Sequence, residues 1–151
     1  MVRQAQVSKT GEGAYRHHAP METASQALKA FYRRYNQACN EHRFADLGAF
    51  VADEVQVNGQ RQDLPGYIAG LEGCVRGFPD YRWDLQRLLV DGSHIAAHFI
   101  DTGTHLGRFL DIPATGRSVT TQEFAIYRVE AGKIAEVWVT ADNLGLIEQL
   151  R

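Results

Sequence analysis

The sequence predicts an α+β domain in which helices come first and an antiparallel sheet follows. Two changes along the chain indicate this. Up to about residue 78, apolar residues recur at three- and four-residue steps, which is the period of a helix. After Pro79 and Asp80 they alternate instead, in four segments rich in Val, Ile, Phe, Tyr and Thr that are typical of strands. Strands this long are expected to curl, so that sheet and helices form a cone with an apolar interior and one open mouth.

The first part of the chain predicts three helices and one strand. The first helix is expected to begin near Met21 and to carry one apolar face: Ala24, Ala27, Leu28, Phe31, Tyr35, Ala38 and Cys39. A short helix fits residues 45–52, and a first strand fits residues 55–59. Asp63 and Pro65 mark the start of the third helix, which is expected to run to about Phe78.

The second part predicts four strands and a closing helix. The strands are expected at residues 81–90, 94–104, 117–130 and 133–141. Asp91-Gly92 and Ala131-Gly132 predict hairpin turns, because glycine supplies the positive φ that such turns need. Residues 105–116 contain Pro113 and Gly116 and predict a loop. A short helix over residues 143–150 is expected to end the domain.

Residues 1–20 differ from the rest because they contain scarcely any large apolar side chain. Such a segment cannot bury enough surface to offset the entropy lost on ordering. We therefore expect a flexible N-terminal tail over residues 1–20 and one domain over residues 21–151. The pair His17-His18 is expected to be solvated rather than to bind a metal. The segment has charges but no apolar stretch after them, unlike a secretory signal.

The composition excludes several classes of protein. Sixteen Lys and Arg against eighteen Asp and Glu give a net charge of -2, which disfavours a nucleic-acid partner. No apolar run approaches the roughly 18 residues that a membrane helix needs. Two cysteines, Cys39 and Cys74, are too few for a disulfide framework or a metal cluster. Both are expected to be reduced, which suits a cytoplasmic location.

Alternation along each strand sorts its side chains into two faces. One set of faces is small and aliphatic and suits packing under the helices. The other set mixes aromatic and ionisable groups, as a pocket for a small molecule requires: Trp138, Asp142, Glu123, Tyr127 and His98. This second set fits the lining of the cone's interior. Alternation alone leaves open that it is an outer surface, solvated or covered by a second copy.

Each candidate also has a structural explanation. Asp142 stands just before the last helix and fits an N-cap as well as an acid/base. Glu123 fits a catalytic carboxyl, a structural partner of His98 on the neighbouring strand, or a solvated group. His98 fits a donor to the ligand or a histidine with its hydrogen bonds satisfied on the sheet. Trp138, Trp83 and Tyr127 fit ligand-contacting walls or core residues. Asn58 fits a hydrogen-bond donor or a turn residue, and His105 fits a binding residue or a structural one in its loop.

Five short motifs occur in the second half of the chain: Gly-Thr-His-x-Gly at 103–107, Ile-Pro-x-Thr-Gly at 112–116, Gly-Lys-Ile at 132–134, Trp138 followed four residues later by Asp142, and Gln149-Leu150. Upstream, VADEVQVNG, GFPDYRW and the Asp-Gly turn follow in order. In these features the chain resembles the SnoaL-like polyketide cyclase (ester cyclase) family of the nuclear transport factor 2-like superfamily. The resemblance covers about residues 22–150.

The resemblance implies a cone-shaped α+β barrel (nuclear transport factor 2-like, cystatin-like) whose concave sheet faces the ligand. Family cyclases close a ring by intramolecular aldol condensation of an anthracycline-type ester, with neither a metal nor a cofactor. An aspartate near the end of the last strand acts as acid/base there, and Asp142 occupies the matching place. The family's cyclases also carry a polar Gln/His pair on the preceding strand. The nearest positions here hold Ala125 and Tyr127, and a methyl group cannot orient a carbonyl.

The sequence thus favours a cofactor-independent acid/base enzyme acting on a small apolar or aromatic carbonyl compound. A related isomerase, hydratase or hydroxylase is an alternative, and so is a non-enzymatic binding or dimerisation module. An ionisable group at the bottom of a dry pocket would distinguish an enzyme from a module. We also expect a homodimer, because several apolar side chains fall where helices do not cover the sheet: Phe99, Phe124, Ile126 and Val137.

Overall fold

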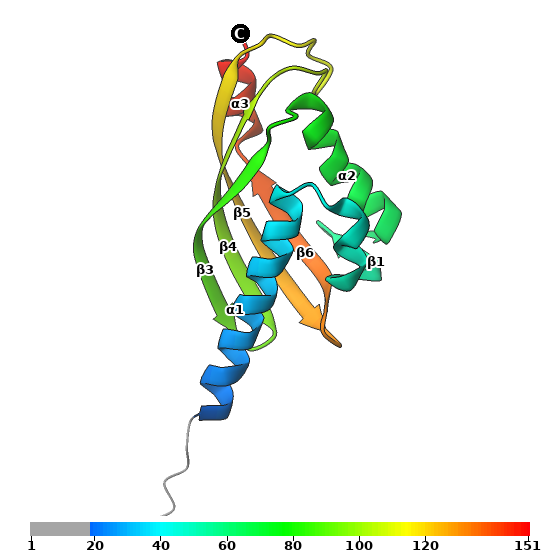
Figure 1. The fold of residues 1–151 in the computed structure, drawn as a ribbon, viewed down its shortest axis with the longest axis vertical. Helices are drawn as coiled ribbons and strands as arrows, with labels where there is room; N and C mark the ends of the chain where they lie inside the picture. Colours follow the sequence, from blue (N-terminus) through cyan, green and yellow to red (C-terminus); the bar gives the residue numbers. More distant parts are fainter. Residues whose placement is uncertain (1–18) are drawn as a thin grey trace, which may run out of the picture.

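The computed structural model describes residues 19–151 of the chain. Its elements are α1 (Ala19–Asn40), the 3-10 helix η1 (Phe44–Ala49), β1 (Val51–Val57), β2 (Gln60–Asp63), α2 (Leu64–Gly77), β3 (Arg82–Asp91), β4 (His94–Thr104), β5 (Ser118–Glu130), β6 (Lys133–Ala141) and α3 (Asn143–Gln149). The predicted α+β fold is confirmed (Figure 1). The predicted tail of residues 1–20, with the pair His17-His18, lies almost entirely outside the described residues, and α1 begins two residues before Met21.

The six strands form one curved sheet in the order β2-β1-β6-β5-β4-β3 (Figure 1). Neighbouring strands are antiparallel except β1 and β6, which are parallel. The sheet is therefore mixed, whereas a purely antiparallel sheet was expected. The parallel pair brings residues 51–57 beside residues 133–141, so the last long strand lies in the middle of the sheet rather than at its edge.

Helices α1 and α2 cover one face of this sheet (Figure 1). Two asparagines attach α1 to the backbone of β3 at Trp83. The Trp83 N–H donates to Asn40 Oδ1 at 2.8 Å, and the amides of Asn40 and Asn36 donate to the Trp83 carbonyl at 3.0 and 3.2 Å. The aromatic rings of Tyr32 and Tyr35 then pack between α1 and the sheet, where both are buried. No helix in the described part of the chain is long and apolar enough to cross a membrane.

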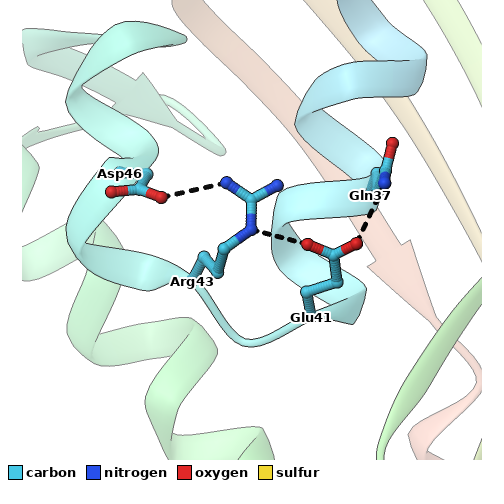
Figure 2. A network of polar contacts seen from close by, with 4 residues as sticks. All are labelled: Gln37, Glu41, Arg43 and Asp46. Carbon is cyan, nitrogen blue, oxygen red and sulfur yellow. Dashed lines mark hydrogen bonds and ion pairs between the residues drawn. The ribbon is translucent and has the colours of Figure 1, made fainter.

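The turn from α1 to η1 is held by polar contacts at the surface (Figure 2). Arg43 donates through Nε to Glu41 at 2.6 Å and through Nη1 to Asp46 at 2.9 Å, while Gln37 donates to Glu41 at 2.9 Å. The hydrogen bond from Gln37 lowers the pKa of the Glu41 carboxyl most, and the hydrogen bond from Arg43 lowers it further. The groups are exposed, so the contacts fix the path of the turn more than they stabilise the fold.

The motif Gly-Thr-His-x-Gly has a structural role at the C-terminal end of α2. The backbone N–H groups of Leu106 and Gly107 both donate to the Gly77 carbonyl at 3.0 Å, which satisfies one carbonyl of the helix end. A Cβ on Gly107 would lie 2.0 Å from the Arg76 carbonyl oxygen. Only glycine therefore allows the loop to approach α2 this closely.

Candidate functional site

The helix-covered face of the sheet encloses a cavity of about 220 Å³. Helices α1 and α2 form one wall, and residues from all six strands form the other. Its lining is mostly aromatic and aliphatic: Tyr32, Tyr35, Asn36, Cys39, Val57, Gln62, Tyr67, Gly70, Leu71, Cys74, Trp83, Phe99, Glu123, Tyr127, Val137 and Val139. Gln62 and Gly70 are exposed, so the cavity reaches solvent between β2 and α2.

Glu123 is the carboxylic acid of this cavity. It projects from β5 opposite Phe99 of β4, and its carboxyl has no hydrogen-bond or ion-pair partner among the residues that the structure describes. Burial raises the pKa of Glu123 to about 8, and the nearby negative charge of Asp101 adds to this effect. A carboxyl group with a pKa near neutrality can both accept and return a proton at physiological pH.

Asp101 lies beside Glu123 on the same face of the sheet. Its cross-strand partner is Thr121, two residues before Glu123, so the two acids are diagonal neighbours. Asp101 is fully buried, and one oxygen, Oδ2, accepts a hydrogen bond of 3.1 Å from the Tyr81 hydroxyl. Burial raises the pKa of Asp101 to about 7, although the bond from Tyr81 acts in the opposite direction. Two like charges on neighbouring residues of a largely apolar interior are costly, so the pair favours states that keep at least one proton.

Two tyrosines supply a hydroxyl group that can bind a ligand oxygen. The hydroxyls of Tyr35 on α1 and Tyr67 on α2 hydrogen-bond to each other, and both side chains line the cavity. One hydroxyl proton lies between the two oxygens, so the other proton remains to be donated. Burial raises the pKa of both groups, so they stay protonated at neutral pH.

The structure brings together three of the predicted site residues. Glu123, Tyr127 and Trp83 all line the cavity, and the last two are 6% exposed. The ring of Tyr127 packs 5.0 Å from that of Tyr32, between centroids, and Trp83 packs edge-on against Tyr81 at 4.7 Å. Tyr127 on β5 and Trp83 on β3 thus both contribute an aromatic wall to the cavity.

His98 and Trp138 were expected in the same cavity, and this prediction was wrong. Both lie on the outer face of the sheet, where Trp138 is 52% exposed and donates through Nε1 to Glu136 at 3.2 Å. His98 stacks on Phe124, with ring centroids 4.5 Å apart, and its two ring nitrogens contact Arg87 and the Gln122 side chain. The expected pairing of His98 with Glu123 is therefore excluded by the sheet between them.

The physical reason is strand register. Alternation assigns residues to two faces within one strand, but register decides which faces of neighbouring strands coincide. The register pairs Tyr127 with Val137 and Phe99 with Glu123, so odd-numbered residues of β4, β5 and most of β6 share the inner face. Trp138 and His98, at even positions, consequently face outward.

Asp142 is likewise outside the cavity. Its side chain is exposed and accepts the backbone N–H of Gly145 at 2.9 Å, which makes it the N-cap of α3. The N-cap alternative given above is thus what the geometry shows. Asn58 has a comparable structural function: its side chain receives the Val139 N–H at 2.8 Å and donates to the Val139 carbonyl at 3.1 Å, extending the pairing of β1 with β6.

His105 is fully buried and also lies outside the cavity lining. Its Nδ1 accepts the Thr115 N–H at 3.2 Å and lies 3.0 Å from the Thr115 hydroxyl, so the ring holds both ends of the loop together. Among the described residues, no group of three or more His, Cys, Asp or Glu side chains is arranged to hold a metal ion.

Three residues of the site were missed by sequence reasoning. Asp101 falls on the aliphatic face of β4, and the signal that marks it is a charged residue at a position that alternation predicts to be buried. Tyr35 was assigned only to the apolar face of the first helix, and its partner Tyr67 lies within the predicted third helix, where it was not singled out as a site residue. Nothing in the sequence indicates that their hydroxyls meet.

A larger hollow of about 520 Å³ lies on the outer face. It is lined by residues of β3 to β6 that include Leu89, Phe124, Ile126 and Trp138, all at least half exposed. It contains no buried carboxyl, and its ionisable side chains, Arg87 and His98, contact each other at the surface. The smaller inner cavity is therefore the better candidate for chemistry.

Comparisons with known proteins agree with this architecture. A family model for SnoaL-like polyketide cyclases matches residues 29–150. A SnoaL-like polyketide cyclase from Agrobacterium tumefaciens superposes with a TM-score of 0.74 and 33% sequence identity, over 82% of this chain and 98% of that chain. The comparison with curated proteins gave no match.

More distant structures share the fold with different assigned activities. IdmH of Streptomyces antibioticus, assigned as a polyketide cyclase, has a TM-score of 0.73 and 23% identity over 81% of this chain and 96% of its own. AclR of Streptomyces galilaeus, assigned as a hydroxylase, has a TM-score of 0.74 and 20% identity over 83% of this chain and 85% of its own. The fold therefore does not by itself fix the reaction.

Proposed function

The chain belongs to the SnoaL-like polyketide cyclase family, and on that premise we propose that it is a cofactor-independent acid/base enzyme. Its reaction is the intramolecular aldol closure of a ring in an apolar carbonyl compound. The observation that carries this proposal is the Glu123 carboxyl, which lies in an aromatic cavity and has no partner among residues 19–151. A module that only bound ligands would have no need for a buried, unpaired acid there.

The steps follow from the groups that line the cavity. The Glu123 carboxylate removes a proton from the carbon next to a carbonyl, and the Tyr35–Tyr67 pair donates a hydrogen bond to the oxygen that becomes the enolate. The enolate carbon then bonds to a second carbonyl carbon of the same molecule. The carboxylic acid of Glu123 returns the proton to the alkoxide oxygen formed by that attack. The aromatic walls exclude water and hold the substrate folded.

This assignment moves the acid/base from Asp142 to Glu123. The exposed Asp142 carboxyl already caps α3 and lies outside the cavity lining. Ala125, which replaces a polar side chain of the family's cyclases, also lies on the inner face beside Glu123 and Tyr127. We infer that the tyrosine pair, rather than a side chain at position 125, orients the carbonyl.

Proton removal can be tested without the natural substrate. The protein should accelerate exchange of the α-protons of α-tetralone for deuterium in D₂O, measured by proton NMR. Glu123→Gln should slow this exchange by about 10²-fold or more, the usual contribution of a positioned general base. Glu130→Gln, at the exposed end of the same strand, should leave it unchanged. Equal exchange by the Glu123→Gln variant and the parent protein would exclude Glu123 as the base.

We further propose that two copies associate through the outer face of the sheet. Leu89, Phe124, Ile126 and Trp138 are 67%, 53%, 52% and 52% exposed, and the register pairs Ile126 with Trp138, so this apolar surface is continuous. The same patch on a second copy would cover it across a two-fold axis. Phe99 and Val137, also expected at this surface, are buried on the inner face instead.

Light scattering after size exclusion tests this arrangement. We expect the mass of a dimer at micromolar concentration, and the mass of a monomer for Ile126→Asp. The matched control is Leu144→Asp on α3, which changes a leucine that is 69% exposed but outside the patch. A monomeric parent protein, or an Ile126→Asp variant that remains a dimer, would show that this face does not carry the interface.

A further inference from the structure

We propose that the inner cavity accepts an uncharged carbonyl compound of one or two rings and rejects the extended polycyclic esters on which cyclases of this kind act. The inference rests on the proposed function for the chemistry of the site. Its limits on size and charge come from the cavity itself.

The first limit is volume. A dry cavity of about 150 Å³ holds one benzene molecule, which corresponds to about 25 Å³ for each non-hydrogen atom. On this scale the cavity of about 220 Å³ holds about nine such atoms, the size of a phenyl ketone. Two fused rings with a carbonyl need slightly more and can extend into the mouth. A four-ring skeleton with about 18 ring carbons needs about 450 Å³, twice the space present.

The second limit is the rigidity of the walls. The rings of Tyr32, Tyr35 and Tyr127 lie 5.0 to 6.1 Å from one another, between centroids, and Phe99 packs on Tyr32 at 6.4 Å. These four side chains are also core residues, each at most 6% exposed. Enlarging the cavity on this side would separate core contacts, so the opening between β2 and α2 is the side that can accommodate additional atoms.

The third limit is charge. Within the part of the chain that the structure describes, the cavity lining contains no lysine, arginine or histidine, and its carboxyl group, Glu123, has the buried acid Asp101 beside it. An anionic ligand would lose its hydration and find no positive charge in the lining to offset that loss. A neutral ketone instead offers an oxygen that accepts a hydrogen bond from the tyrosine pair.

The opening offers a position at which the cavity can be blocked without disturbing the core. Gly70 lies on α2 in the lining, and a Cβ built there meets no atom within 4 Å. Gly73, one turn further along α2, lies outside the lining, and a Cβ there meets only the end of the Arg76 side chain at 3.6 Å. Gly70→Phe and Gly73→Phe are therefore a matched pair of variants on one helix.

Binding is measured directly, by NMR of protein labelled with nitrogen-15 at tryptophan. The indole of Trp83 lines the cavity, whereas that of Trp138 lies on the outer face and is an internal control; Trp138→Phe assigns the two signals. Acetophenone and α-tetralone should shift the Trp83 signal saturably. Tetracenequinone, which has four rings, and para-acetylbenzoate, which carries a carboxylate, should each bind at least about tenfold more weakly. The first is too large for the cavity, and the second brings a negative charge into it.

Gly70→Phe should weaken acetophenone binding by about tenfold or more, and Gly73→Phe should not. The inference is overturned if the four-ring quinone or the carboxylate binds as tightly as acetophenone, if acetophenone shifts only Trp138, or if no ketone binds at millimolar concentration. The proposed function fails in a different way. In that case ketones still bind and shift the Trp83 signal, but the Glu123→Gln variant exchanges α-protons as fast as the parent protein.

Discussion

Replacing Glu123 by glutamine should make the protein more stable at alkaline pH. In the folded protein the pKa of Glu123 is raised to about 8, whereas an exposed glutamate titrates near 4.3. The folded state therefore binds more protons than the unfolded state between these two values, and the free energy of unfolding falls as pH rises through this range. Glutamine keeps the shape of the side chain and removes the ionisation. The free energy of unfolding of the variant therefore does not fall in this way as pH rises.

The magnitude follows from the shift. Each pH unit between the two pKa values lowers stability by up to about 1.4 kcal/mol, which gives an upper limit of about 5 kcal/mol. Because the cavity opens to solvent at Gln62 and Gly70, water can enter and solvate the charged form. We therefore expect Glu123→Gln to be about 2–3 kcal/mol more stable than the parent near pH 9, and similar to it near pH 5.

Urea denaturation followed by tryptophan fluorescence and circular dichroism measures this difference at a series of pH values. Glu130→Gln removes an exposed carboxyl that pairs with Arg128 and should stay within about 1 kcal/mol of the parent at each pH. A parent protein whose stability is flat from about pH 5 to pH 9, with no gain in Glu123→Gln, would refute the reasoning that folding favours the neutral acid.

Three further predictions concern the neighbours of this carboxyl and the structural motifs. Burial is the main cause of the raised Glu123 pKa, and Asp101→Asn removes the charge that adds to it, so the pH–rate profile of α-proton exchange should move to lower pH; an unmoved profile would show that the two acids do not interact. Asp142→Ala removes the cap of α3 and should lower stability by about 1 kcal/mol in urea denaturation while exchange stays unchanged; a large loss of exchange would return Asp142 to the site. Gly107→Ala places a Cβ 2.0 Å from a carbonyl oxygen of α2 and should lower the melting temperature strongly, whereas Gly73→Ala should not; equal melting temperatures would contradict the close approach of the loop.

The bounds of the long strands were predictable because glycines mark their turns. Gly92 and Gly132 both adopt positive φ, and the strands on either side begin and end within about one residue of the prediction. The strand β2 was missed because its sequence, QRQD, has no apolar alternation and every residue of it is exposed. The signal that precedes it, Asn58-Gly59, is a hairpin turn of the same kind, with both residues at positive φ.

The site was only partly predictable because it depends on contacts across strands. Glu123 and Tyr127 were found together since both lie on β5, and alternation relates residues of one strand reliably. Placing His98 on the same face required the register between β4 and β5, which the local sequence does not encode. The prediction that His98 shares a face with Glu123 was therefore wrong. Asp101 belongs beside Glu123 only once β4 and β5 are aligned.

The attachment of α1 to Trp83 has a consequence for how copies of the protein meet. An unprotected outermost strand can recruit another chain by backbone pairing, which leads to aggregation. At β3 the side chains of Asn36 and Asn40 occupy the free backbone groups of Trp83, and at the opposite margin β2 is four residues long, polar and charged. Growth by strand addition is thereby discouraged at both margins, which leaves the broad outer face as the surface for the proposed association of two copies.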